Sequence, residues 1–136
     1  MNMRSLCALG LAALVAACAN APSRSKLDET LYAYAGAIRW GDLGSVEVFL
    51  DPERRAELAP KPIERERMAQ LQVTGYHVQS KEQSSETELR QVVQITLVNR
   101  HTLVERSVID RQVWRWDEEA KAWWLTSGLP DFAPGR

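Results

Sequence analysis

The feature that most constrains the fold is a two-residue alternation of apolar and polar side chains in the second half of the chain. Four stretches rich in β-branched and aromatic residues carry it, which is typical of strands that bury one face. We expect strands at about residues 71–83, 88–99, 102–116 and 122–126. Because short polar turns join them, the strands should pair antiparallel.

These strands are longer than the usual five or six residues. A sheet of such strands must twist and bend strongly, so we expect a β-bulge in the third strand. The chain has 136 residues, of which 45% are hydrophobic and 26% charged. That composition indicates one soluble globular domain with one core.

Helical periodicity precedes the strands. Ser25 and Asp28 fit a capping box, which predicts a helix from Ser25 onward. We expect Gly41 to end this helix in a left-handed conformation. The buried stripe of the helix would consist of Leu27, Leu31, Tyr34, Ala35 and Ile38.

Two shorter helices should follow. Asp42 is suited to cap one that runs through Val46, Phe49 and Leu50. Asp51 with Pro52 is suited to start another over residues 53–58, which Pro60 and Pro62 would end. The predicted class is therefore α+β, with N-terminal helices packed on a strongly curved four-stranded antiparallel sheet.

The N-terminal segment is typical of a secretory signal peptide. One Arg and no acid precede an apolar run over residues 6–17, which is shorter than the roughly 20 residues that span a bilayer. The run ends in Leu14-Val15-Ala16-Ala17-Cys18, which resembles the lipobox of bacterial lipoproteins. The resemblance implies cleavage before Cys18 and lipidation of its thiol. An ordinary secretory cleavage site nearby is the alternative.

In such lipoproteins Asp after the Cys retains the protein at the inner membrane, whereas Ala19 and Asn20 follow here. The resemblance thus implies an outer-membrane, periplasm-facing protein, held by a lipid anchor. We divide the chain into a signal peptide (1–17), a lipidated Cys with a tether (18–24), one α+β domain (25–130) and a flexible C-terminus (131–136).

Further residues carry a second resemblance. Several segments together look like a group of uncharacterised Gram-negative lipoproteins: Tyr34-x-x-x-Ile38-Arg39-Trp40-Gly41-Asp42, Phe49-Leu50-Asp51-Pro52-Glu53 and Asp110-Arg111-Gln112-x-Trp114-Arg115-x-Asp117, with Trp124-Leu125 and Leu129-Pro130. The order of a helix and long strands is also similar to the cystatin-like cone of the nuclear transport factor two-like superfamily. That superfamily includes ketosteroid isomerases, polyketide cyclases and non-enzymatic binding domains. The likeness is one of topology and implies no catalytic residue here.

Several function classes find no support. Lys and Arg number 17 against 18 Asp and Glu, so we expect no nucleic-acid partner. His77 and His101 are the two histidines and lie outside any metal-binding motif, so we expect neither a metal nor a cofactor. The chain also lacks the Gly-x-Ser-x-Gly motif and a Gly-rich phosphate loop.

One stretch suggests a pocket. In the third predicted strand Arg106, Asp110 and Gln112 share the phase of the apolar Val104, Val108, Trp114 and Trp116. Polar groups in an apolar, concave sheet face are what a small-molecule pocket requires. The resemblance to isomerases would make Asp110 a general base, with Tyr34 or Tyr76 as donor. We favour instead an Asp110 that pairs with an Arg or faces solvent, because Arg106 and Arg111 are near in sequence.

Trp is the other conspicuous residue. The chain has five, for which core packing is the default, but adjacent Trp123 and Trp124 must face opposite sides of a strand. We expect a non-enzymatic binding or assembly module for an envelope protein or a small apolar ligand. The alternative is an isomerase-like or cyclase-like enzyme that uses Asp110. The oligomeric state is left open, with dimerisation through the outer sheet face as one option.

Overall fold

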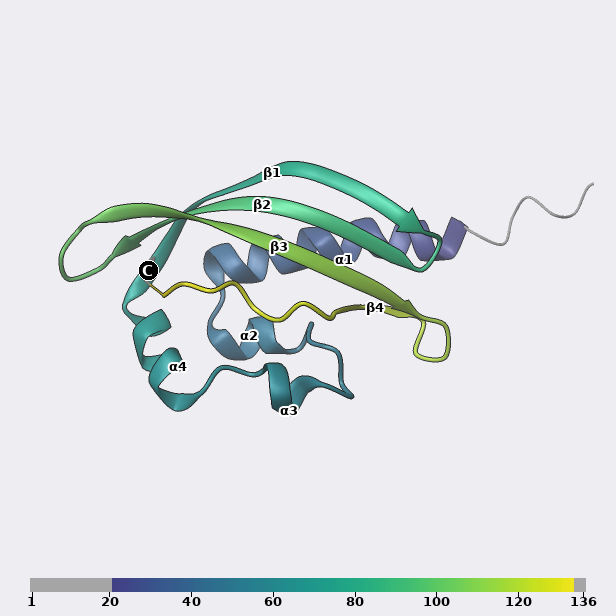
Figure 1. The fold of residues 1–136 in the computed structure, drawn as a ribbon, viewed down its shortest axis with the longest axis horizontal. Coiled ribbons are helices and arrows are strands. Elements are labelled where there is room, and N and C mark those ends of the chain that lie inside the picture. The colour runs from purple at the N-terminus through teal and green to yellow at the C-terminus, as the bar shows by residue number, and fades with distance from the viewer. Residues whose placement is uncertain (1–20, 134–136) are drawn as a thin grey trace, which may run out of the picture.

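A computed structural model describes residues 21–133, so Cys18 and the predicted signal peptide lie outside the described residues. Four helices come first: α1 (Ala21–Trp40), α2 (Leu43–Glu47), α3 (Arg55–Leu58) and α4 (Pro62–Ala69). Four strands follow: β1 (Leu71–Ser85), β2 (Glu88–Asn99), β3 (Glu105–Asp117) and β4 (Ala122–Leu125) (Figure 1). They form one antiparallel sheet in the order β1-β2-β3-β4, so the predicted α+β class with helices first is confirmed.

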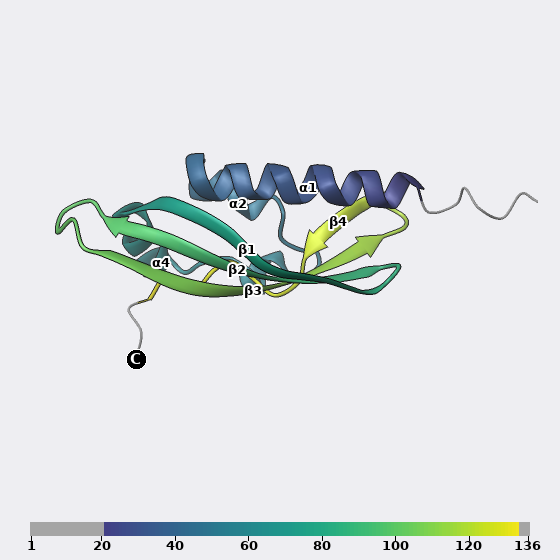
Figure 2. The same ribbon diagram turned by 90° about the horizontal axis from the view of Figure 1, so that it is seen from above.

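The core lies between α1 and one face of the curved sheet, as Figure 2 shows from above. The alternation in β2 determines this face, because every second residue from Leu89 to Leu97 is buried. Within the described helices, none is long and apolar enough to cross a membrane. The buried apolar side chains are Leu27, Tyr34, Ile38, Val46, Leu50, Leu89, Val93, Ile95, Leu97, Trp114, Trp116, Trp123 and Leu125.

The predicted bulge in the third strand is wrong. β2 and β3 pair continuously, from Glu88 opposite Arg115 to Val98 opposite Glu105. The register shifts occur in β1 instead, after Val73, Val78 and Gln83. The reason is that β1 is an edge strand, where an extra residue disturbs one ladder, whereas β3 has neighbours on both sides.

Helix α1 also departs from prediction at both ends. It includes residues 21–24, which we assigned to a tether, so Ser25 is an exposed helical residue rather than a cap. Gly41 is not left-handed: its N–H continues the helical pattern by donating to Ala37 O (2.9 Å). A Cβ at Gly41 would lie 2.7 Å from that same oxygen, so glycine is required there by space.

The short helices follow the predicted caps in part. Asp42 caps α2, because its Oδ1 accepts a hydrogen bond from the Ser45 N–H (2.8 Å). The helix ends at Glu47, before the predicted Phe49 and Leu50. Asp51 accepts one from the Glu53 N–H (3.0 Å), but α3 begins only at Arg55. The other Asp51 oxygen instead pairs with Arg115 (2.9 Å) and ties this segment to β3.

Two further segments differ from the sequence interpretation. Pro62 does not end a helix but stands in the first turn of α4, where its missing N–H is harmless. Residues 131–133, assigned to a flexible terminus, are docked: Phe132 packs against the core and its carbonyl accepts a hydrogen bond from Arg106. The C-terminal segment therefore belongs to the domain.

Candidate functional site

The even-numbered face of β3 points inward along its whole length, because its pairing with β2 is continuous. Asp110 and Gln112 are consequently buried beside Trp114. Arg111 is exposed on the other face, and Arg106 bonds to the carbonyls of Phe132 and Ala133. Our preference for an Asp110 that pairs with Arg or faces solvent is therefore wrong.

Gln112 is the centre of a buried hydrogen-bond network. Its Nε2 donates to Asp110 Oδ2 (2.7 Å) and to the Tyr76 hydroxyl (3.0 Å). Its Oε1 accepts from Trp114 Nε1 (3.0 Å) and from Gln91 Nε2 (3.1 Å). Every hydrogen-bonding position of the Gln112 amide is thus used, which is what a buried amide requires.

Gln91 is a member of this network that the sequence analysis did not identify. It stands in the buried phase of β2 between Leu89 and Val93, and its partner across the strands is Gln112. A polar residue at a buried position of an alternating strand was the signal available in the sequence. The β1 register shift after Val73 brings Tyr76 opposite Ile95 and so onto the same face.

Tyr34 reaches the same region from α1. Its ring is fully buried and packs edge-on against Phe49 (centroids 5.4 Å apart) and Trp114 (5.0 Å). Its hydroxyl has no hydrogen-bond partner among residues 21–133, although the charge of Asp110 acts on it. A buried hydroxyl without a partner is costly, and the Tyr34 hydroxyl takes no part in the Gln112 network.

Burial controls the ionisation of these groups. It raises the pKa of Asp110 to about 6, although the hydrogen bond from Gln112 opposes the rise. Burial, and then the charge of Asp110, raise the pKa of Tyr34 well above its ordinary value. Burial likewise raises the pKa of Tyr76, against the effect of its bond with Gln112. Asp110 is therefore the group that changes charge near neutral pH.

This buried cluster has the chemistry of a base but lies apart from both clefts described below. The side chains around Asp110 touch one another, with Gln112, Trp114 and Tyr34 almost fully buried. The two clefts described below are lined by other residues. Trp116 lies further along β3, where it packs against Trp123 and bonds to Glu118.

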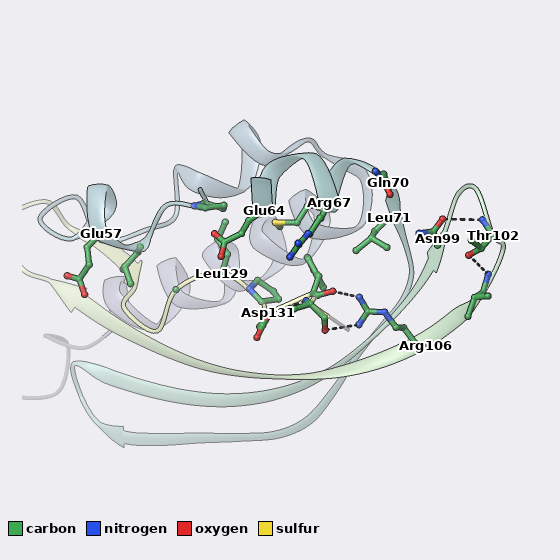
Figure 3. Close-up of a pocket in the computed structure, with 18 residues that line it drawn as sticks. Glu57, Glu64, Arg67, Gln70, Leu71, Asn99, Thr102, Arg106, Leu129 and Asp131 are labelled. Atoms are coloured by element: carbon green, nitrogen blue, oxygen red, sulfur yellow. Dashed lines mark hydrogen bonds between the residues drawn. The ribbon is translucent and has the colours of Figure 1, made fainter. Parts of the chain in front are cut away.

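The larger cleft has a volume of about 870 Å³ and lies near the start of β3 (Figure 3). Helices α3 and α4, the beginnings of β1 and β3, the end of β2 and the C-terminal segment all contribute to its lining. Its apolar wall consists of Leu58, Pro60, Met68, Leu71, Val104, Leu129, Pro130 and Phe132.

Among the predicted pocket residues, Arg106 alone lies in this cleft. Its guanidinium holds the C-terminal segment in place through the carbonyls of Phe132 and Ala133 (3.3 Å to the latter). The structure therefore separates the predicted set: Tyr34, Tyr76, Asp110, Gln112 and Trp114 come together, whereas Arg106 and Trp116 lie apart.

A second cleft, of about 580 Å³, lies between the C-terminal end of α1 and the start of β1. Met68, Leu71 and Phe132 line both clefts and so form the partition between them. Trp40 borders the second cleft with 77% of its surface exposed, contrary to the expected core packing. Its ring stacks under the Arg39 guanidinium, 5.2 Å from the ring centroid.

The remaining predicted residues occupy ordinary positions. His77 and His101 are exposed, and within residues 21–133 no group of three or more His, Cys, Asp or Glu side chains could hold a metal ion. Trp123 is buried and donates to the Ser23 carbonyl (2.9 Å), whereas Trp124 is half-buried on the opposite face. Cys18 is outside the described residues, so its lipidation stays a prediction.

Comparison with known proteins supports the fold. No protein-family model matches the sequence, and no curated protein does either. A ketosteroid isomerase-like protein from Erwinia carotovora atroseptica is similar in structure, with a TM-score of 0.54 and 16% identity over 75% of this chain and 89% of that chain. A protein of unknown function with a cystatin-like fold from Nostoc punctiforme gives a TM-score of 0.49 and 13% identity over 75% and 84% of the two chains. At 16% identity the first of these likenesses concerns the fold alone.

Proposed function

We propose that this protein is a non-enzymatic binding module that holds a small apolar ligand in the larger cleft. The observation that carries the proposal is the cleft itself, with about 870 Å³ and a largely apolar wall. Ligand sites in proteins have volumes of roughly 300 to 1,000 Å³, apolar linings and a few polar groups. The cleft meets each of these conditions, and no member of the Asp110 cluster lines it.

We further propose that the domain is anchored through a lipidated Cys18 in the outer membrane and faces the periplasm. Only Ala19 and Asn20 separate Cys18 from α1. Figure 1 places the start of α1 beside the β1–β2 and β3–β4 turns, at the other end of the molecule from α4. An anchor near α1 would therefore leave the cleft directed away from the bilayer and open to ligands.

The test uses photolabelling of the full chain in cell envelopes with a diazirine-bearing dodecanol, a neutral apolar probe. We expect the label on peptides that line the cleft, and we expect Leu129→Trp to abolish this labelling by filling the space. Ile109→Trp is the matched control, because Ile109 is exposed on the opposite face of the sheet. Labelling confined to other peptides, or unchanged in Leu129→Trp, would disprove the proposal.

An isomerase-like or cyclase-like enzyme is the second candidate function. Two observations favour it: the pKa of Asp110 is raised to about 6, and the buried Tyr34 hydroxyl has no partner within residues 21–133. Such a pair could take a proton and stabilise an oxyanion if the cluster opened. The same labelling distinguishes the candidates, because an opened cluster would place the label on residues 110–114 of β3 and on Tyr34 of α1, which line neither cleft.

A further inference from the structure

We propose that the ligand of the larger cleft is a single-chain amphiphile with an anionic head group, and that Arg67 binds that head group. The inference rests on the proposed function, since it names the ligand class of the same cleft. It starts from the charged side chains that line the cleft, which are Glu57, Glu64, Arg67, Arg106 and Asp131.

Four of these five charges already have partners. Glu57 pairs with Arg54 (3.0 Å), and Glu64 Oε2 accepts the Lys61 N–H (2.8 Å). Asp131 Oδ1 accepts the Ala133 N–H (2.9 Å). Arg106 donates to two carbonyls of the C-terminal segment, as the dashed lines in Figure 3 show. The three acids and Arg106 therefore make contacts within the protein.

Arg67 is the exception, because its guanidinium has no hydrogen bond or ion pair within residues 21–133. Figure 3 shows its side chain extending from α4 toward the C-terminal segment around Leu129, so it enters the cleft. A guanidinium presents parallel N–H donors that match the oxygens of a carboxylate or a phosphate. An anion is therefore the complement that this side chain lacks.

The surroundings of Arg67 determine the rest of the ligand. Met68 follows it on α4, and Leu71, Leu129 and Phe132 continue the apolar wall. An alkyl chain that packs against this wall would remove its apolar surface from water. This burial favours binding by about 25 cal/mol per Å² of surface buried. A ligand with one anionic head group and one alkyl chain would match both the Arg67 guanidinium and the apolar wall.

The experiment compares two photoreactive probes of equal length on the full chain in cell envelopes, diazirine-bearing dodecanoate and diazirine-bearing dodecanol. We expect the carboxylate to label the cleft peptides about tenfold more efficiently than the alcohol, the ratio expected of one charge-assisted hydrogen bond. Arg67→Gln should reduce carboxylate labelling to the level of the alcohol and leave alcohol labelling unchanged. Arg111→Gln is the control, because it removes an exposed Arg from the other sheet face.

Competition identifies the head group. Unlabelled dodecanoate and dodecyl phosphate should both suppress the labelling, whereas dodecanol at equal concentration should suppress it less. Equal labelling by the two probes, or carboxylate labelling unchanged by Arg67→Gln, would overturn the inference and leave the binding module intact. Failure of both probes to label the cleft would overturn the proposed function itself.

Discussion

Gln112 Nε2 lies 2.7 Å from Asp110 Oδ2, and both side chains extend from the same face of β3 into the core. This bond stabilises the carboxylate, whereas burial favours the neutral acid, and burial is the larger effect because the pKa of Asp110 is raised to about 6. The free energy of unfolding therefore depends on whether Asp110 is charged, because the hydrogen bond from Gln112 only partly offsets the cost of burying that charge.

Asp110→Asn should stabilise the protein at neutral pH. Since the raised pKa of Asp110 means that the folded state binds the proton more tightly, the wild-type protein loses stability as pH rises from about 4 through about 6. Asn cannot ionise and keeps an oxygen for Gln112. We expect the variant to be more stable by roughly 1 to 3 kcal/mol at pH 7.5, with the difference vanishing near pH 3.5. Urea unfolding at several pH values measures this, and a constant difference across the range would contradict it.

Gln112→Leu should be strongly destabilising. Leucine fills a similar volume but leaves Tyr76, Gln91 and Trp114 without the partner that Gln112 supplies to each. Because each buried polar group left without a partner costs about 1 to 3 kcal/mol, we expect a loss of roughly 3 kcal/mol or more. Gln79→Leu on the exposed part of β1 is the control, with an expected change of about 0.5 kcal/mol or less. Equal effects in thermal unfolding would show that the network contributes little.

Gly36 in α1 and Gly41 directly after it should respond in opposite directions to alanine. A Cβ at Gly41 would lie 2.7 Å from Ala37 O and 3.0 Å from Ser45 Cβ, so Gly41→Ala forces the backbone apart. Gly36 has nothing within 4 Å of such a Cβ, so Gly36→Ala should stabilise α1 by roughly 0.5 to 1 kcal/mol. Chemical denaturation of the two variants compares them. A stabilising Gly41→Ala would contradict the close approach of α1 and α2.

Cys18→Ala should release the protein from the membrane fraction and leave the fold unchanged. Within residues 21–133 the core begins at Leu27, so the substitution alters none of the described core side chains. Several acyl chains, at about 0.8 kcal/mol per buried methylene, would make the natural anchor effectively permanent. Fractionation of cells, with circular dichroism of the released chain, tests both parts. Unchanged membrane association would refute the anchor at Cys18.

Parts of the fold were predictable because they depend on neighbours in the sequence. The alternation in β2 predicted its bounds and buried face, and Asp42 predicted the start of α2. The even phase of β3 likewise placed Asp110, Gln112 and Trp114 on one face. Gln91 is a polar residue in the buried phase of β2, which the sequence shows. Its partner Gln112 follows only from the register between β2 and β3.

What the tertiary structure alone decided depends on contacts between distant segments. The bulges belong to β1 because it is an edge strand, a position that periodicity does not reveal. Arg106 shares the phase of Asp110 but binds residues 132–133, and Arg67 faces a cleft assembled from segments far apart in the chain. Sequence patterns report the period and caps of each element, since these arise within a few residues. Which side chains meet in a buried cluster, and where a cleft opens, is decided only when elements far apart in the chain pack together.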